Sequence, residues 1–277
     1  MRIFAFADEA SPYIDGQIKA MQKNGVAGLE IRGVDKVNVA DISDAKAREV
    51  RAKLDAAGLV TWSVGSPIGK IDIEKDSFET HLEKFKRTLE IADILGAENI
   101  RLFSFFVPKE NPQDYKEKVI ERLGIFCETA KGSGVTLCHE NEKGIYGDTA
   151  GRCLEIHKAL PELKAIFDPA NFVQCGQDTL KGWEQLKPYV KYLHIKDALA
   201  DGNVVPAGKG IGNVGAILKD FIAMGGNAVT LEPHLKVFDG LKALEQEDDK
   251  SVVGEVYSYA SNEEAFAAAA DALKALL

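Results

Sequence analysis

The chain alternates short apolar runs with amphipathic helical patterns along its whole length, and this alternation most constrains its fold. We expect strands at residues 3–6, 28–31, 60–64, 99–103, 135–140, 164–168, 189–195 and 228–232. A strand followed by a helix predicts a parallel sheet, because the helix returns the chain to the side where the next strand begins. Eight such units favour a closed (β/α)8 barrel, and a doubly wound open sheet is the alternative.

Helix boundaries support this division. A glycine, the residue that most readily ends a helix, follows each of the helical patterns at 45–57, 78–95, 115–131 and 214–224. The 277 residues, of which 45% are hydrophobic, suffice for one large core. We therefore expect a single domain that spans residues 1–277.

Charge and targeting signals narrow the range of partners. The formal net charge is −9 and no long basic block occurs, which argues against nucleic acid or an anionic membrane as a partner. No apolar run approaches the roughly 18 residues of a membrane span, and the amino terminus reaches Asp8 too soon for a signal peptide. The four cysteines show no C-x-x-C spacing, so reduced thiols and a cytoplasmic location are expected. Homo-oligomerisation is left open.

Four metal-capable side chains close four consecutive expected strands. They are Glu140, Asp168, His194 and Glu232. The carboxyl ends of parallel strands meet on one face of a barrel, so these side chains should converge there. Three carboxylates and one imidazole would hold a divalent cation in oxygen-rich coordination. Helix caps or salt bridges account for one or two such residues, whereas four in succession predict a metal site.

Other residues near the same face are weaker candidates. Trp62 could stack on a sugar face, or it could pack against a loop. The Gly-rich stretch 198–213 is not a Walker A sequence, but its main-chain amides and Lys209 could bind a phosphate or a polyol; a flexible turn is the default. For the acidic run at 245–250, a solvated loop is favoured over a lid. His139 should point away from the site, because neighbouring strand residues face opposite sides.

Short motifs in a fixed order give the chain a resemblance to a known family. They are Cys138-His-Glu-Asn141, Phe167-Asp-Pro-Ala-Asn171, Leu193-His-Ile-Lys-Asp197 and Leu231-Glu-Pro-His234. Through them the chain resembles the xylose-isomerase-like TIM barrel superfamily, specifically its sugar phosphate isomerase/epimerase family, over essentially its whole length. The resemblance implies one divalent metal ion bound by Glu140, Asp168, His194 and Glu232. Mn²⁺ or Mg²⁺ is favoured for these ligands, with Co²⁺ or Zn²⁺ as alternatives.

The resemblance also implies catalytic roles for Glu140 and Glu232. In ketose 3-epimerases of this superfamily, the two glutamate ligands face opposite sides of the substrate carbon and pass a proton through a metal-stabilised enediolate. Many of these epimerases carry a His where this chain has Asn171. An Asn can hydrogen-bond a substrate hydroxyl but cannot titrate, which argues against a simple ketose 3-epimerase.

Further substrate contacts are expected from residues beside the proposed ligands. Lys196 and Asp197 follow the His ligand and could bind substrate oxygens. Glu30 and Arg32 could do so from the second strand, with one of the two expected to point outward.

We therefore expect an isomerase or epimerase that acts on a sugar, sugar phosphate or polyol-derived hydroxy-carbonyl compound through an enediolate. A metal-dependent lyase similar to inosose or dehydroshikimate dehydratases is the first alternative, because its reaction begins with the same proton abstraction. A DNA-repair enzyme similar to endonuclease IV would need a basic groove and more histidine ligands than five histidines supply. A non-catalytic sugar-binding barrel is disfavoured because all four ligand types are present.

Overall fold

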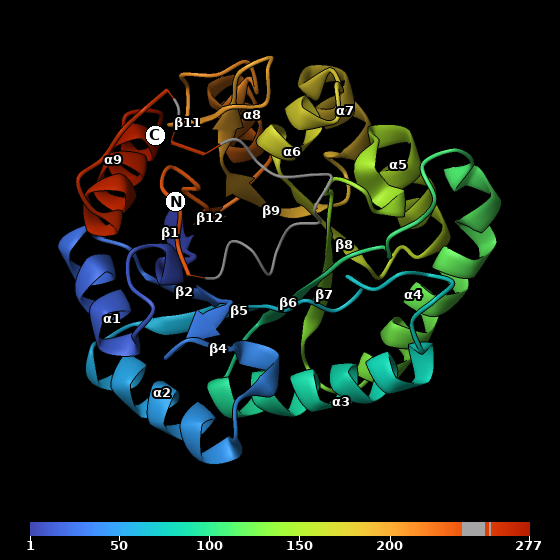
Figure 1. Ribbon diagram of the computed structural model, residues 1–277, viewed down its shortest axis with the longest axis horizontal. Coiled ribbons are helices and arrows are strands. Elements are labelled where there is room, and N and C mark those ends of the chain that lie inside the picture. The colour runs from blue at the N-terminus through green and yellow to red at the C-terminus, as the bar shows by residue number, and fades with distance from the viewer. Residues whose placement is uncertain (240–252, 255) are drawn as a thin grey trace.

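A closed parallel barrel forms the centre of the molecule (Figure 1). The computed structural model describes residues 1–239, 253–254 and 256–277. Neighbouring strands follow the order β1-β12-β9-β8-β7-β6-β5-β2, and β2 pairs with β1 to close the barrel. The barrel strands are β1 (Arg2–Ala5), β2 (Gly28–Ile31), β5 (Val60–Gly65), β6 (Asn99–Leu102), β7 (Thr136–Glu140), β8 (Lys164–Phe167), β9 (Val190–Ile195) and β12 (Ala228–Leu231).

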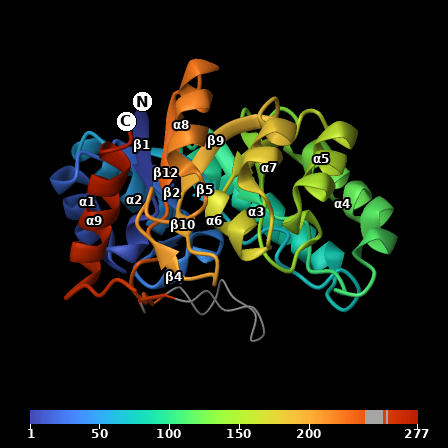
Figure 2. The ribbon, with the colours of Figure 1, turned by 90° about the horizontal axis from the view of Figure 1, so that it is seen from above.

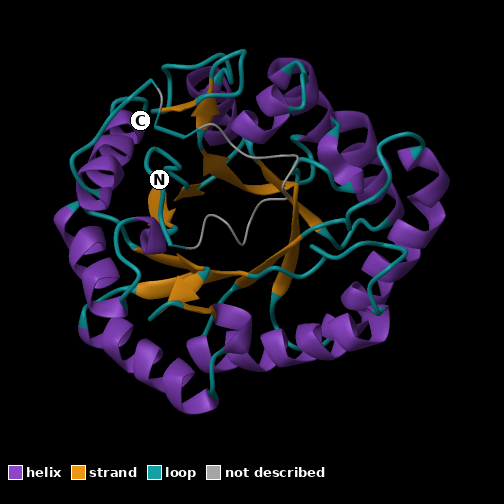
Figure 3. Ribbon diagram, in the orientation of Figure 1, coloured by secondary structure: helices purple, strands orange, loops and turns teal. Residues whose placement is uncertain are grey.

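Helices form a ring around these strands (Figure 3). They are α1 (Ile14–Lys23), α2 (Asp44–Ala56), α3 (Phe78–Leu95), α4 (Lys116–Ala130), α5 (Ala150–Ala159), α6 (Pro169–Gln174), α7 (Thr179–Leu186), α8 (Val214–Ala223) and α9 (Asn262–Lys274). The predicted (β/α)8 barrel is confirmed, and closure of the sheet excludes the open alternative.

Helix α3 illustrates how the sequence sets these elements. It begins after Ser77, whose hydroxyl accepts a hydrogen bond from the Thr80 amide at 3.2 Å. It ends at Gly96, where φ is 65°, a left-handed backbone conformation that favours glycine. Its bounds coincide with the helix predicted at 78–95.

An apolar floor closes the lower part of the barrel interior. It consists of Phe4, Trp62, Cys138, Ile166, Tyr192 and Ala228. Alternate residues of a strand face the same side, so the next inward positions toward the carboxyl ends lie directly above this floor. On three neighbouring strands those positions are Glu140, Asp168 and His194, and the polar site therefore rests on a packed core.

Two short hairpins extend beyond the carboxyl ends of the barrel strands. Figure 2 shows β4 and β10 at the end of the molecule opposite the two termini. Strand β3 (Gly33–Val34) pairs with β4 (Val37–Asn38), and β10 (Asp197–Ala198) pairs with β11 (Val204–Val205). The second hairpin therefore occupies part of the predicted loop at 198–213. The acidic run at 245–250 lies outside the described residues.

The sequence also led to expectations about membrane-spanning segments and about disulfides. Within the described ranges, every helix is too short or too polar to cross a membrane. In the same ranges, the four cysteines form no disulfide.

Candidate metal centre

The four predicted metal ligands meet at the carboxyl ends of neighbouring barrel strands. Glu140 and His194 lie in β7 and β9, while Asp168 and Glu232 directly follow β8 and β12. One donor atom from each residue lies within 4.8 Å of the donor atoms of the other three, and all four side chains are buried. The structure therefore brings together all four residues from separate strands.

Each carboxylate of this group has one oxygen fixed by the surrounding protein. The fixing groups are the guanidinium of Arg101 for Glu140 Oε2 (3.1 Å), the guanidinium of Arg32 for Glu232 Oε1 (3.2 Å) and the main-chain amide of Asn171 for Asp168 Oδ1 (2.9 Å). The second oxygen of each carboxylate faces the shared space. Charge-assisted hydrogen bonds of this kind are strong, so the carboxylates are held in position before any ligand binds.

The imidazole of His194 is held in place through its Nε2 atom, which contacts Glu30. Its Nε2 lies 3.1 Å from Glu30 Oε2, and Glu30 Oε1 accepts a hydrogen bond from the Tyr192 hydroxyl at 2.9 Å. Its Nδ1 faces the other way, 2.9 Å from Glu140 Oε1 and 3.5 Å from Glu232 Oε2. A carboxylate behind a histidine commonly fixes the ring and its tautomer in metal sites, and here it leaves Nδ1 as the inward donor.

The ammonium of Lys196 lies among the inward oxygens. Its Nζ is 3.1 Å from Asp168 Oδ2 and 3.0 Å from Glu232 Oε2. Asp168 Oδ2 is buried and accepts no hydrogen bond of regular geometry from the described residues. Among the described residues the Lys196 ammonium is thus the cation that faces this oxygen, and a metal ion that displaced it could bind there.

The carboxylates and cations of the centre shift one another's ionisation. Burial raises the pKa of Asp168 to about 7; the Lys196 ammonium opposes this rise, and the Glu232 and Glu140 carboxylates add to it. Burial also favours neutral Glu232, but Lys196, His234 and His194 together outweigh it and hold the pKa of Glu232 well below its usual range. Burial lowers the pKa of His194, yet Glu140 and Glu30 raise it well above the ordinary value. The centre is a concentrated negative field that attracts cations.

The residues present fit a divalent metal ion. The inward donors are three carboxylate oxygens and one imidazole nitrogen, a set that suits Mn²⁺ or Mg²⁺ and also accommodates Zn²⁺. The lone pairs left on Asp168 Oδ2 and the fixed orientation of His194 Nδ1 are what such an ion would use.

Asn171 lies beside the centre. Its side-chain amide donates to Glu140 Oε1 at 3.3 Å and to the main-chain oxygen of Asn141 at 2.9 Å. The structure thus places this predicted substrate contact next to a candidate ligand, where it adds a neutral donor.

Glu30 and Arg32 both point into the barrel. Glu30 contacts His194, and Arg32 contacts Glu232. The expectation that one of the two would point outward was wrong, because residues two apart in a strand share a face. Glu30 is fully buried behind the imidazole, so its position is that of a residue that orients His194.

Trp62 is not among the residues gathered at the centre. Its ring stacks on Phe4 at a centroid distance of 4.7 Å, and the guanidinium of Arg2 lies 4.8 Å from the ring centroid. Both contacts are with residues of β1, and they hold the ring in the layer beneath the centre. The ring packs in the apolar floor, and no substrate contact is proposed for it.

Asp197 anchors the Gly-rich loop. Its carboxylate accepts hydrogen bonds from the main-chain amides of Gly208, Gly210 and Gly212 at 2.9–3.0 Å. A Cβ at Gly210 or Gly212 would come within 2.4 or 2.6 Å of Asp197 Oδ1, so glycine permits this close approach. These amides are therefore engaged within the protein, and Lys209 stands exposed between them.

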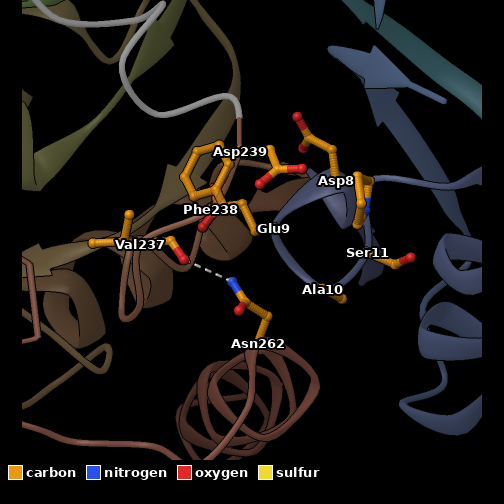
Figure 4. A pocket seen from close by; sticks show the side chains of 9 residues that line it. Asp8, Glu9, Ala10, Ser11, Val237, Phe238, Asp239 and Asn262 are labelled. Carbon is orange, nitrogen blue, oxygen red and sulfur yellow. Dashed lines mark hydrogen bonds between the residues drawn. The ribbon is translucent and has the colours of Figure 1, made fainter. Parts of the chain in front are cut away.

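A cavity of about 390 Å³ opens beside the centre (Figure 4). Asp8 and Glu9, which follow β1, line one side, and Phe238, which follows β12, lines another. Glu9 Oε1 lies 3.1 Å from the Arg32 guanidinium that also holds Glu232. Burial raises the pKa of Glu9 to about 8, against the opposing effect of Arg32. The cavity has the size of a small-molecule pocket and is one contact away from the candidate ligands.

A second group of metal-capable residues, Glu9, Glu232 and His234, adjoins the first. The guanidinium of Arg32 contacts both of its carboxylates, at 3.1 and 3.2 Å. Because this fixed cation already neutralises them, the second group is less suited to a metal ion than the first.

Sequence reasoning missed Arg101 and Tyr192. Arg101 holds Glu140, and Tyr192 holds Glu30, which in turn holds His194. Periodicity could have indicated Tyr192, because Tyr192, His194 and Lys196 follow one another at intervals of two residues and therefore face the same side, the barrel interior. His139, by contrast, points outward as predicted, and its Nε2 lies 3.0 Å from the Ser104 hydroxyl.

Comparison with known proteins agrees with the barrel fold described above. A family model described as a xylose isomerase-like TIM barrel matches residues 18–276. A 3-dehydroshikimate dehydratase from Bacillus anthracis is 23% identical over 179 residues, which make up 63% of this chain and 63% of that protein. The chain thus matches less than two thirds of that relative's length.

Solved structures align over nearly the whole chain. The IOLI protein with a bound zinc atom has a TM-score of 0.77 at 16% identity, covering 100% of this chain and 98% of that one. D-Psicose 3-epimerase with D-tagatose, from Clostridium cellulolyticum H10, has a TM-score of 0.70 at 17% identity, covering 99% and 97%. At these identities the similarity shows a shared fold.

Proposed function

Because the chain belongs to the xylose isomerase-like TIM barrel family, we propose that it is a divalent-metal-dependent isomerase or epimerase. Its substrate is a small hydroxy-carbonyl compound of the sugar, sugar phosphate or polyol class. The observation that carries this proposal is the convergence of two glutamates, an aspartate and a histidine, all buried, with each carboxylate held by one oxygen.

The proposed ligands are Glu140, Asp168, His194 and Glu232. A divalent ion at this site would act as a Lewis acid and lower the cost of negative charge on substrate oxygens. Arg101 and Arg32 would keep the two glutamates oriented as the charge of the substrate changes. The apolar floor beneath and the buried side chains around them exclude bulk water from this part of the barrel.

The two glutamates are the proposed acid–base pair. One carboxylate removes the proton from the carbon next to the carbonyl, which leaves an enediolate. If the other returns a proton to the opposite face of that carbon, the result is epimerisation. If a proton returns to the neighbouring carbon, the result is aldose–ketose isomerisation. Both routes use carboxylates as general bases and acids.

A lyase is the second candidate, supported by the similarity to a 3-dehydroshikimate dehydratase. Its reaction starts with the same proton abstraction. The enediolate then expels a β-hydroxyl, which leaves as water after accepting a proton. Deciding between the two requires the product, because the same carboxylates serve both first steps.

A substrate panel tests the proposal. The protein would be stripped with a chelator and reloaded with Mn²⁺, Mg²⁺, Co²⁺ or Zn²⁺. It would then be incubated in deuterated water with ketoses, their phosphates, inosose and 3-dehydroshikimate. Deuterium incorporation with rearranged products, followed by NMR, supports an isomerase or epimerase, whereas water loss supports the lyase. Turnover that is unchanged after metal removal would contradict both.

A further inference from the structure

The position of Lys196 has a consequence for metal binding. Its ammonium touches two of the three inward carboxylate oxygens, Asp168 Oδ2 and Glu232 Oε2. The remaining oxygen of each carboxylate is already used, by the Asn171 amide and by Arg32 respectively. The lone pairs that Lys196 occupies are therefore those that a metal ion needs.

An ammonium and a divalent ion cannot share this position. A hard cation such as Mg²⁺ lies about 2.0–2.1 Å from its oxygen ligands. An ammonium that remained about 3 Å from the same oxygens would lie close to the ion and be strongly repelled, the more so because the site is buried and poorly screened.

We propose that Lys196 competes with the divalent ion for Asp168 and Glu232, so that metal binding moves its ammonium off these oxygens. Lys196 then sets metal affinity below the value that the four ligands alone would give. The proposal rests on the proposed metal site and adds a regulatory element to it.

A neighbouring carboxylate can receive the displaced ammonium. Glu142 also attracts Lys196 electrostatically and is itself paired with Lys70 at 3.3 Å. Glu142 is partly exposed, whereas Asp168 is fully buried, so this movement is toward a more exposed carboxylate. There the ammonium can donate to a substrate oxygen, which agrees with the substrate contact predicted for Lys196.

Metal titration of variants tests the competition without an activity assay. Lys196→Met removes the charge and keeps most of the side-chain volume, and Mn²⁺ affinity measured by calorimetry should rise at least about tenfold, a typical size for changes next to metal ligands. Lys196→Arg keeps the charge and should not show this gain. Lys191→Met is the matched control, because it removes the same charge from an exposed position of β9, the strand that ends directly before Lys196, and its affinity should equal that of the wild type.

The outcomes separate this proposal from the proposed function. Failure of the wild-type protein to bind Mn²⁺ would remove the metal-dependent function itself. Normal binding by the wild type, with equal or weaker binding by Lys196→Met, would overturn only the competition.

Loss of the buried ammonium could prevent folding without metal, so Lys196→Gln would be prepared as well. If either variant folds only when Mn²⁺ is present, the ion replaces the ammonium and the proposal is supported. If both fail to fold with and without Mn²⁺, the ammonium is needed even beside the ion, and the proposal is wrong.

Discussion

Glu30 lies behind His194 and fixes the direction of its imidazole. Glu30 Oε2 is 3.1 Å from Nε2, while Nδ1 on the other side of the ring is 2.9 Å from Glu140 Oε1. The two residues come from β2 and β9, which are not neighbours in the barrel. Their contact therefore spans the barrel interior. The orientation of His194, a candidate ligand, depends on Glu30, which is not among the residues that line the cavity beside the metal centre.

Glu30→Gln should weaken metal binding by about 10–100-fold, because an amide orients the imidazole less firmly and makes its Nδ1 a poorer donor. Mn²⁺ calorimetry measures this effect directly. Tyr192→Phe removes only the hydroxyl that supports Glu30, so a smaller loss is expected. Wild-type affinity in Glu30→Gln would show that the ring is held by other contacts.

Asp168→Ala and His194→Ala should lose metal and activity together, since each removes a proposed ligand. Metal content after gel filtration, measured by plasma mass spectrometry, gives the result. Asp178→Ala is a matched control for Asp168: each aspartate caps a helix by accepting an amide three residues on, at 2.9 Å for Asp168 and 3.0 Å for Asp178. Full metal occupancy in both ligand variants would refute the ligand assignment.

Asp197→Ala should destabilise the protein by about 3 kcal/mol or more. The substitution removes a buried carboxylate that accepts several main-chain amides, and it leaves those amides without their partner. Urea unfolding gives the free energy. Lys209→Ala in the same loop should change stability by less than about 0.5 kcal/mol, because its side chain is exposed. Equal effects of the two substitutions would contradict the anchoring role of Asp197.

Much of the barrel follows from local sequence. Apolar runs and helix-ending glycines located the eight barrel strands and the helices α2, α3, α4 and α8 to within one or two residues, because burial and backbone sterics act over short stretches. The convergence of Glu140 and His194 followed from the common direction of parallel strands. None of this required knowledge of which side chains touch.

Contacts across the barrel were not accessible in the same way. The pairing of Glu30 with His194 depends on side-chain lengths and on the shift in register within β2 and β5, which no local pattern records. The loop anchored by Asp197 is similar: a G-x-G-x-G spacing indicates close backbone approach, but the approaching group lies eleven or more residues earlier.

The stability of the protein should fall between pH 6.5 and pH 4, in part because of His157. Burial lowers the pKa of this imidazole to about 4, against a usual value near 6.5, although its Nδ1 donates to the Leu163 main-chain oxygen at 3.0 Å. Below pH 6.5 the unfolded chain therefore binds more protons than the folded one, and the stability present above pH 6.5 is lost as the pH falls. The full shift corresponds to about 3 kcal/mol.

His157→Asn tests this contribution, because asparagine keeps a donor near the position of Nδ1 and does not titrate. The difference in unfolding free energy between pH 7.5 and pH 4.5 should be smaller in the variant than in the wild type. Identical pH dependence in the two proteins would show that other buried groups account for the whole loss.

Glu140→Gln and Glu232→Gln should each lower kcat by roughly 10²-fold or more, because glutamine keeps the shape and one oxygen but has no useful basicity. Metal affinity should fall less than in Asp168→Ala, since an amide oxygen can still coordinate. Glu184→Gln, on the exposed side of α7, is the control for the chemical change and should keep wild-type turnover.

Exchange of the substrate proton with deuterated solvent separates the roles of the two glutamates. Glu140 and Glu232 approach the centre from different strands, each fixed by its own arginine, so each can address a different side of the substrate. The variant that lacks the abstracting base should lose exchange, because no enediolate forms. The other should still exchange the proton without completing turnover, since only the return step is blocked. Near-normal turnover in both variants would show that the glutamates act only as metal ligands, and that other residues of the site transfer the proton.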